Sequence, residues 1–379
     1  MAKYKLGDIA PIQQGSVPES ESYWLLNLDM VESNTGHIYE RLYVPFDKIG
    51  TSTIAFDTNN VLYSKLRPYL NKVVIPDCPG YATSEMLPLK PNKNYITREY
   101  LTYFLRSPKF VAYINEKTSG AKMPRANSSD LKSVEIECPT LENQRPITSE
   151  FDRIISIVRL RQQQLQKLDE LVKARFIELF GTIHDNRFGF GVVTLQDVSA
   201  PIKDGTHQTP TYTTDVENGY KFLSSKDVTT GKVDWSHLKY IPEELHRELY
   251  ARISPRRGDI LLAKNGTTGI AAIVDRDEVF DIYVSLALIR PHGVDPTYLW
   301  AAINAAETKQ QFDASLKGIG VPNLHLGEIK KARIILPPME LQEQFATFVE
   351  QTDKSKVAVQ KALDEAQLLF DSLMQKYFG

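Results

Sequence analysis

The chain has 379 residues, 42% of them hydrophobic and 24% charged, which is typical of a globular protein long enough for two domains. Its 45 Lys and Arg residues nearly balance 47 Asp and Glu residues, so a uniformly basic nucleic-acid binder is disfavoured, although a local basic face is compatible with a net charge of −2. The two cysteines form no CxxC pair and no run of 18 apolar residues occurs, which argues against a disulfide scaffold, a structural zinc site and a membrane span, and favours the cytoplasm.

The first 138 residues predict a mixed α/β domain. Residues 5–10 are expected to lead from a short strand into a loop. Apolar runs rich in β-formers predict strands over 23–30, 41–44, 61–63, 72–75, 81–89 and 131–138. Helical spacing of apolar residues predicts helices over 98–106 and, beyond Pro108, over 110–114.

A long helix is predicted to follow, over residues 139–181, after a turn at Pro139. Apolar residues recur in a heptad pattern along it, at all five a positions and three of the five d positions. The a positions are Phe151, Val158, Leu165, Val172 and Leu179, and the d positions are Ile147, Ile154, Arg161, Leu168 and Arg175. This is a narrow seam, which is typical of a coiled coil and not of a core helix.

The second half of the chain repeats the first. Residues 194–199 resemble the segment at 5–10, residues 258–274 predict strand, glycine-rich turn and strand, and residues 284–290, 298–306 and 332–336 predict strand, helix and strand. A second long helix at 337–379 has the same heptad frame, weakened at Thr352 and Lys356. Its offset from 139–181 is 198 at both ends (337 − 139 and 379 − 181).

The repeat predicts four segments: a mixed domain at 1–138, a long helix at 139–181, a second mixed domain at 182–336 and a second long helix at 337–379. Each helix offers one narrow apolar seam, and pairing with the other buries both. We therefore expect an α+β protein whose two long helices pair as an antiparallel coiled coil about an internal pseudo-two-fold axis.

Catalytic motifs are missing from the sequence. It has no Asn-Pro-Pro-Tyr/Phe or Asp-Pro-Pro-Tyr signature of amino-group methylation, no P-loop, no Gly-x-Ser-x-Gly and no His-Glu-x-x-His. We expect no catalytic residue and no metal site in this chain.

Two matched pairs of polar loops are the candidate DNA-binding elements. In each half, the first loop joins two strands and the second precedes the closing strand. Arg and Asn are residue types that bind the edges of guanine and adenine in the major groove. The first pair contains Lys65, Arg67, Tyr69 and Lys72, matched by Lys264, Asn265, Thr267 and Thr268. The second pair contains Lys122 and Arg125, matched by Lys317 and Asn323. These loops could equally be charged hairpins or proline-fixed supports for the next strand.

A further loop occurs in the second half alone. It spans residues 203–210 and contains Lys203, Thr206 and His207 as candidate DNA contacts. His207 alone is more typical of a hydrogen-bonding loop residue than of a ligand. A loop present in one half suits a role at one half-site.

The chain resembles the specificity (S) subunits of Type I restriction-modification systems over essentially its whole length. The resemblance depends on a set of modest motifs in a fixed order, and the first helix departs from it at its entry, where Thr140 stands in place of a second proline such as Pro338. The motifs are residues 61–72, 120–125 and 139–144 in the first half and 204–210, 258–269 and 337–344 in the second.

This resemblance implies a non-catalytic subunit with two target recognition domains that read a split, asymmetric site in double-stranded DNA. It also implies two modification (M) subunits and restriction (R) subunits as partners, which carry the S-adenosylmethionine, ATP and Mg²⁺ chemistry. The long helices would set the spacer between half-sites. Alternatives are a scaffold or inhibitor that reads no DNA, or a catalytic methyltransferase or endonuclease, which the missing motifs disfavour.

Overall fold

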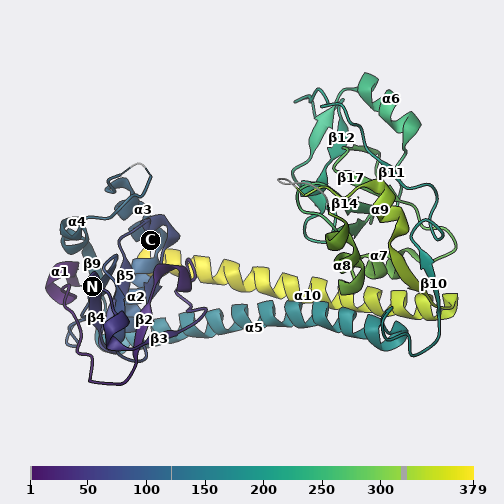
Figure 1. Ribbon diagram of the computed structural model, residues 1–379. Coiled ribbons are helices and arrows are strands. Elements are labelled where there is room, and N and C mark those ends of the chain that lie inside the picture. The colour runs from purple at the N-terminus through teal and green to yellow at the C-terminus, as the bar shows by residue number, and fades with distance from the viewer. Residues whose placement is uncertain (1, 121, 317–321) are drawn as a thin grey trace. The chain divides into compact units, whose positions relative to one another are not determined.

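The computed structural model describes residues 2–120, 122–316 and 322–379 (Figure 1). The chain divides into two units, which we call unit 1 (residues 1–162 and 360–379) and unit 2 (residues 163–359). Two 40-residue helices, α5 (Leu141–Phe180) and α10 (Met339–Phe378), each contribute one end to unit 1 and the other end to unit 2.

Unit 1 contains three small sheets with helices packed around them. The first pairs β1 (Ala2–Lys5) with β9 (Glu135–Cys138), the second has the order β3 (Leu42–Val44), β2 (Tyr23–Leu26), β7 (Gly80–Thr83), β4 (Thr53–Phe56), and the third has the order β6 (Val73–Val74), β5 (Val61–Ser64), β8 (Met86–Leu89). Only the β2–β7 pairing is parallel among these described strands. The helices are α1 (Leu6–Ile9), α2 (Arg98–Arg106), α3 (Pro108–Glu116) and α4 (Ser128–Ser133), with 3₁₀ turns at Leu28–Met30, Phe46–Lys48 and Pro68–Leu70.

Unit 2 repeats this arrangement with additions. Its sheets are β10 (Gly191–Thr194) with β18 (Arg333–Leu336); β11 (Lys203–Asp204), β17 (Leu286–Ile289), β14 (Ile260–Ala263), β15 (Ala271–Ile273) in that order; and β13 (Lys239–Ile241), β12 (Tyr220–Leu223), β16 (Phe280–Ile282) in that order. Its helices are α6 (Glu243–Arg252), α7 (Pro296–Asn304), α8 (Ala306–Ser315) and α9 (Leu326–Lys331), with a 3₁₀ turn at Ser225–Val228. The parallel β12–β16 pair corresponds to β2–β7 in unit 1.

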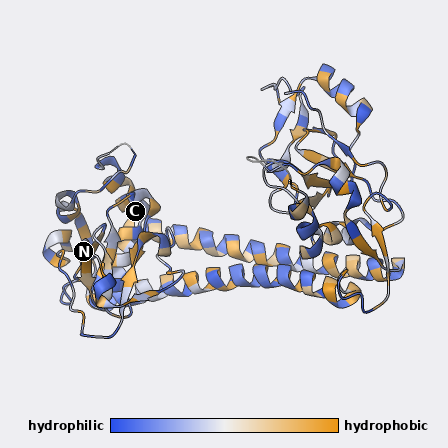
Figure 2. Cartoon of the chain, viewed as in Figure 1, coloured by the Kyte–Doolittle hydropathy of each residue, from blue (hydrophilic) through white to orange (hydrophobic). Residues whose placement is uncertain are grey.

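The long helices pair antiparallel, as the heptads predicted. In unit 1, Phe151 near the start of α5 packs on Phe370 and Phe378 near the end of α10, with ring centroids 5.4 and 6.0 Å apart. In unit 2, Phe180 at the end of α5 packs on Phe345 near the start of α10, at 5.6 Å. All a and d positions of both helices are buried or half-buried, and Figure 2 shows apolar residues alternating with polar ones along them.

The weak part of the second heptad frame has a polar partner. Lys356, at an a position, lies with its ammonium 2.6 Å from the carboxylate of Asp169 on α5, and both residues belong to unit 2. Thr352 is 5% exposed, and its hydroxyl donates to the carbonyl of Phe348 one turn earlier at 2.9 Å. A half-buried lysine at an a position is thus tolerated because an acidic residue of the facing helix pairs with it.

Both long helices begin at equivalent residues, although Pro338 has no counterpart in the first half. Leu141 and Met339 are 198 residues apart (339 − 141), the offset of the sequence repeat. Gln144 and Gln342, on the first turns, are buried and bind the same backbone positions: their side-chain oxygens accept from the amides of Thr97 and Asp295, each at 2.9 Å. The equivalent glutamine therefore fixes the start of each long helix, and the absence of a second proline in the first half does not move the start of α5.

Several predicted elements have different bounds. Residues 131–133 belong to α4 and not to the closing strand, residues 6–9 form α1, and the predicted strand at 81–89 is divided into β7 and β8 by a turn at 84–85. The predicted strand at 23–30 ends at Leu26 and continues as a 3₁₀ turn. The elements that the sequence did not predict include strands β4, β12, β13 and β16 and helices α6, α8 and α9.

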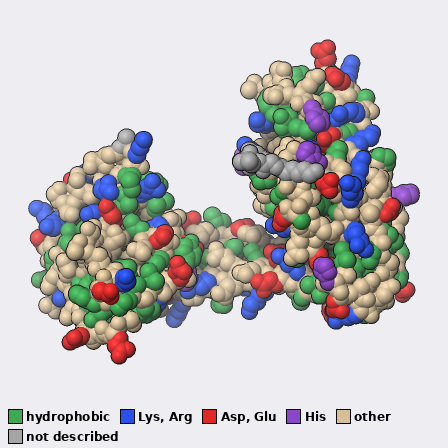
Figure 3. All heavy atoms as spheres, in the orientation of Figure 1, with side chains coloured by type: hydrophobic (Ala, Val, Ile, Leu, Met, Phe, Trp, Pro, Cys, Tyr) green, Lys and Arg blue, Asp and Glu red, His purple; other side chains and the backbone are tan. Residues whose placement is uncertain are grey.

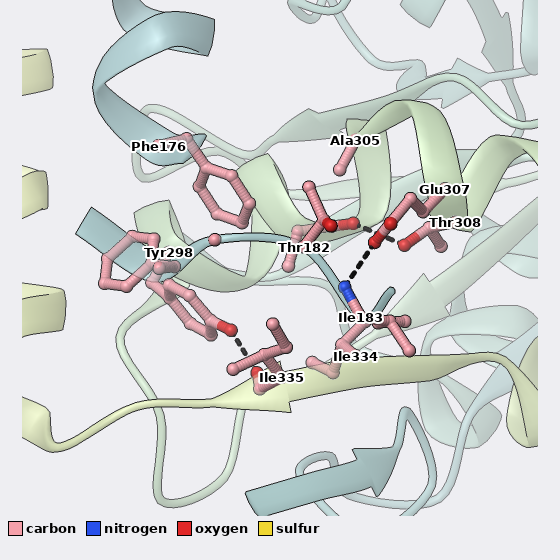
Figure 4. A pocket seen from close by; sticks show the side chains of 12 residues that line it. Phe176, Thr182, Ile183, Tyr298, Ala305, Glu307, Thr308, Ile334 and Ile335 are labelled. Atoms are coloured by element: carbon pink, nitrogen blue, oxygen red, sulfur yellow. Dashed lines mark hydrogen bonds between the residues drawn. The ribbon is translucent and has the colours of Figure 1, made fainter. Parts of the chain in front are cut away.

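The segment after α5 is tied to unit 2. Figure 4 shows the Glu307 carboxylate directed at the backbone of Ile183, whose amide donates to it at 2.6 Å, and the hydroxyl of Tyr298 donating to the carbonyl of Ile335. The cavity among these side chains measures about 20 Å³, enough for about one water molecule. This part of the fold therefore anchors the segment that follows α5, and its cavity has room for no ligand much larger than a water molecule.

Candidate nucleic-acid interface

In each unit the two predicted loops meet and hydrogen-bond to one another. In unit 1 the amide of Arg67 donates to the carbonyl of Pro124 at 2.7 Å, and the amide of Ala126 donates to the carbonyl of Lys65 at 2.8 Å. In unit 2 the amide of Gly266 donates to Pro322 at 3.1 Å, and that of Leu324 donates to Lys264 at 2.8 Å. We call this arrangement the loop crossing; it brings together segments that lie about sixty residues apart in the sequence.

The crossing has a third backbone partner in both units. The amide of Lys65 donates to the carbonyl of Glu85, and the amide of Lys264 donates to the carbonyl of Ser285, each at 2.9 Å. Isolated bridges pair Leu66 with Arg125 in unit 1 and Asn265 with Asn323 in unit 2. The backbone frame is thus the same in both units, whereas the side chains it carries differ.

One position of the frame needs a left-handed backbone. Gly266 adopts φ +77° in unit 2, where glycine has no steric cost, and Arg67 adopts φ +48° at the equivalent place in unit 1. A left-handed conformation costs a non-glycine residue roughly 1–2 kcal/mol. Strain of this kind is concentrated at functional sites, and keeping an arginine here is consistent with a use for its side chain.

Five predicted residues of unit 1 carry side chains that reach solvent. Four are exposed, namely Arg67, Tyr69, Lys122 and Arg125, with Tyr69 at 51%, and Lys65 is half-buried. Lys72 is different: its ammonium donates to the carbonyl of Leu28 at 2.7 Å, and burial lowers the pKa of this ammonium. Lys72 therefore supports the loop instead of presenting its charge to a ligand.

Unit 2 distributes its predicted residues differently. Lys264, equivalent to Lys65, is 6% exposed, and its ammonium lies 3.4 Å from the carboxylate of Asp204. Thr206 is buried, and its hydroxyl accepts from the amide of Gln208 at 3.3 Å. Lys203 donates to the carbonyl of Arg252 at 3.1 Å. Lys264 thus joins the 203–210 loop to the crossing, Lys203 joins it to α6, and the Thr206 bond lies within the loop.

The remaining predicted residues of unit 2 are accessible. Thr267 and His207 are exposed, and the ring of His207 lies 3.1 Å from the Asp204 carboxylate. Three others are half-buried: Asn265, Thr268 and Asn323. Lys317 lies outside the described residues.

Sequence reasoning missed three residues that organise these loops. Glu85 binds Arg125, Asp204 binds Lys264, and Arg252 of α6 donates to the carbonyls of Asp204 and Gly205 at 2.8 and 2.6 Å. The sequence hides Glu85 because residues 81–89 predict one strand, whereas Glu85 occupies the turn between β7 and β8. The offset of about 199 residues between the halves is the signal that could place it beside Lys65.

The described residues also form surfaces and a cleft away from the loop crossings. On the face shown in Figure 3, basic and acidic side chains are interspersed. A cleft of about 500 Å³ in unit 2 is lined by residues that include Phe176, Trp300 and Lys356, and none of the loop-crossing residues contributes to it. Among the residues that the structure describes, no group of three His, Cys, Asp or Glu side chains could hold a metal ion, and no helix has the length and apolarity to cross a bilayer.

Comparison with known proteins identifies the family. The model of the Type I restriction modification DNA specificity domain matches residues 1–170 and 189–366. The Type I restriction enzyme MjaVIII specificity subunit of Methanocaldococcus jannaschii is 25% identical over 312 residues, covering 75% of this chain and 71% of that protein.

Solved structures share the fold. A chain from a study of assembly and conformational transition of a type I R-M system aligns with a TM-score of 0.61 and 18% identity, covering 100% of this chain and 97% of that one. The S subunit of the Type I restriction-modification system from M. genitalium aligns with a TM-score of 0.58 and 14% identity, covering 100% and 96%. Because the family model matches most of the chain in two segments, and each segment contains one loop crossing, this protein belongs to the Type I restriction modification DNA specificity family.

Proposed function

We propose that this chain is the DNA sequence-recognition subunit of a Type I restriction-modification complex and reads a bipartite, asymmetric target with its two loop crossings. The observation that carries the proposal is the common backbone frame with different side chains. Arg67 and Arg125 in unit 1 stand where unit 2 has Gly266 and Asn323. Since base edges are distinguished by the hydrogen-bonding groups opposite them, the two crossings would select different half-sites.

The contacting residues follow from accessibility. In unit 1 the proposed contacts are Lys65, Arg67, Tyr69, Lys122 and Arg125; in unit 2 they are His207, Asn265, Thr267, Thr268, Asn323 and, outside the described residues, Lys317. Lys72, Lys203, Thr206 and Lys264 act instead as supports of these loops, because their polar groups are engaged within the protein. Net charge near zero is compatible with this role if partner subunits supply phosphate contacts.

The proposal extends to the division of labour in the complex. Residues 1–138 and 182–336 would be the two target recognition domains, and helices 139–181 and 337–379 would set the spacer and hold two modification subunits, with restriction subunits completing the complex. The chain itself performs no catalytic step. Methylation of an adenine requires extrusion of the base from the duplex, and we assign that step, together with S-adenosylmethionine, ATP and Mg²⁺, to the partners in the cytoplasm.

The test removes two of the positive charges of the unit 1 crossing, those of Lys65 and Arg67. We expect the double variant Lys65→Ala, Arg67→Ala to assemble normally with modification subunits. Its affinity for target DNA should fall by about tenfold or more, and the slope of log affinity against log salt should decrease by about one to two. Gel-shift titrations of the modification–specificity complex at several salt concentrations measure both quantities.

The matched control removes two exposed lysines from other loops of unit 1, Lys48→Ala with Lys93→Ala, and should leave binding unchanged. Loss of assembly in the Lys65, Arg67 variant would show that the loop is structural. A wild-type complex that binds random duplexes with no sequence preference would support the scaffold alternative instead.

A further inference from the structure

In unit 1 an ion pair between Arg125 and Glu85 spans the loop crossing. The Nε atom of Arg125 lies 3.1 and 3.2 Å from the two carboxylate oxygens of Glu85, and the Nη2 atom lies 2.9 Å from Oε1. The backbone segment at Lys65 lies between the two residues and hydrogen-bonds to both neighbouring segments. The arginine side chain therefore reaches across one segment to a carboxylate on the other side of it.

This geometry leaves one edge of the guanidinium available. A guanidinium has two edges that can each donate a pair of parallel N–H bonds, and Glu85 occupies the Nε–Nη2 edge. On the second edge, Nη1 donates one long hydrogen bond, of 3.5 Å, to the carbonyl of Met123. The Arg125 side chain as a whole is 44% exposed. Two parallel donors match the O6 and N7 acceptors of guanine in the major groove.

Unit 2 shows that the fold does not need this ion pair. The same backbone crossing forms there with Ser285 in place of Glu85 and Asn323 in place of Arg125. The hydroxyl of Ser285 accepts instead from the amide of Ser225 at 2.9 Å. Because the backbone frame forms without this pair in unit 2, we infer that Arg125 and Glu85 have a role other than closing the loops.

We propose that Arg125 is a specificity-determining residue that reads one guanine in the half-site bound by unit 1, and that Glu85 is the positioning residue that fixes its guanidinium. The inference rests on the proposed function and deepens it, because it assigns one base and one pair of side chains. An arginine held by a carboxylate presents its donors in one orientation, so less side-chain freedom is lost when the base is bound.

The experiment compares complexes of modification subunits with wild-type, Arg125→Ala and Glu85→Gln chains. Sequencing of methylated adenines in cells that carry each complex gives the recognised motif. We expect Arg125→Ala to make one guanine of one half-site degenerate and to leave the other half-site unchanged. Glu85→Gln should keep the guanine but reduce discrimination against the other bases at that position by about 10-fold or more, within the range of a bidentate base contact.

A second measurement tests the contact itself. In gel-shift titrations, replacing that guanine by 7-deazaguanine removes the N7 acceptor. It should weaken binding of the wild-type complex by about 10- to 100-fold and have little further effect on the Arg125→Ala complex. Asp77→Asn is the matched control, because it breaks another arginine–carboxylate pair of unit 1, with Arg41, and should not alter the motif.

The outcomes separate this inference from the function on which it rests. A split motif that keeps its guanine in Arg125→Ala, or a half-site without guanine, would overturn the inference and leave the proposed function intact. A Glu85→Gln chain with a lowered melting temperature and equal loss of affinity for all bases would show that the pair is a structural clamp. A wild-type complex that selects no split motif would refute both.

Discussion

Gln144 and Gln342 occupy equivalent positions on the first turns of the two long helices, α5 and α10. Gln144 donates to the carbonyls of Tyr95 and Pro139, and Gln342 donates to that of Pro337. Each side-chain oxygen accepts from the N-cap amide of a domain helix that precedes it in the chain, α2 for Gln144 and α7 for Gln342. Each side chain thus joins the start of a long helix to a domain helix. A shorter or charged side chain cannot both donate and accept at these places.

Removing one of these glutamines should be costly. Gln342→Ala leaves the amide of Asp295 and the carbonyl of Pro337 without their partner, and unsatisfied buried groups destabilise by about 1–3 kcal/mol. Urea denaturation followed by fluorescence measures the change in the free energy of unfolding. The exposed neighbour Gln344→Ala is the control and should change it by less than about 0.5 kcal/mol. Equal effects of the two substitutions would contradict the role given to Gln342.

At the scale of elements, the ends of the long helices complete the domain cores. Phe378, at the end of α10, packs on Tyr100 of α2 with ring centroids 5.1 Å apart, and Phe180, at the end of α5, packs on Tyr298 of α7 at 4.9 Å. Both phenylalanines are buried. The domain of unit 1 therefore takes part of its core from the last helix of the chain, and the domain of unit 2 takes part of its core from α5.

This packing predicts a local loss of stability. Phe378→Ala should destabilise unit 1 by about 3–5 kcal/mol, because a buried ring is replaced by a cavity. Amide hydrogen exchange should become faster in α2 and in the β1–β9 pair and stay unchanged in α7 and the β10–β18 pair. Phe180→Ala should produce the reverse pattern. Faster exchange in both units from either substitution would contradict the assignment of each ring to one core.

The sequence predicted these elements unevenly, for physical reasons. The long helices carry a seven-residue period over 40 residues, a local signal that does not depend on the rest of the fold. Strand β4, with four residues, is fixed by its non-local pairing with β7, and α6 has a largely polar sequence, so neither has a clear periodicity.

In the candidate site, too, the sequence predicts the features that have a local signal and not those that depend on distant residues. Matched spacing identified both loops of each crossing, whose backbones meet as equivalents. Side-chain direction could not be inferred, because it depends on partners such as Leu28 and Asp204 that lie far away in the sequence. Lys72 and Lys264 were therefore predicted as DNA contacts, although their ammonium groups are held within the protein.

For the whole molecule, the helices α5 and α10 are the elements that both units share. The division between the units falls after Gln162 in α5 and after Val359 in α10. If each crossing binds one half-site, the length of these helices should determine how many base pairs separate the half-sites, as protein geometry does in dimeric DNA-binding proteins. This relation is part of the proposed function and can be tested by changing the length alone.

Inserting four residues into α5 near Gln163, together with four residues after Val359 in α10, should lengthen the preferred spacer. Four helical residues add a rise of about 6 Å and a rotation of about 40°, compared with 3.4 Å per base pair of DNA, so we expect a spacer longer by about one or two base pairs. Sequencing of methylated adenines measures the spacer directly. The paired insertion keeps the antiparallel partners of each unit in register, whereas insertion into α5 alone is the control that disturbs it. Unchanged half-sites with an unchanged spacer in the paired variant would refute the idea that the helices measure the distance.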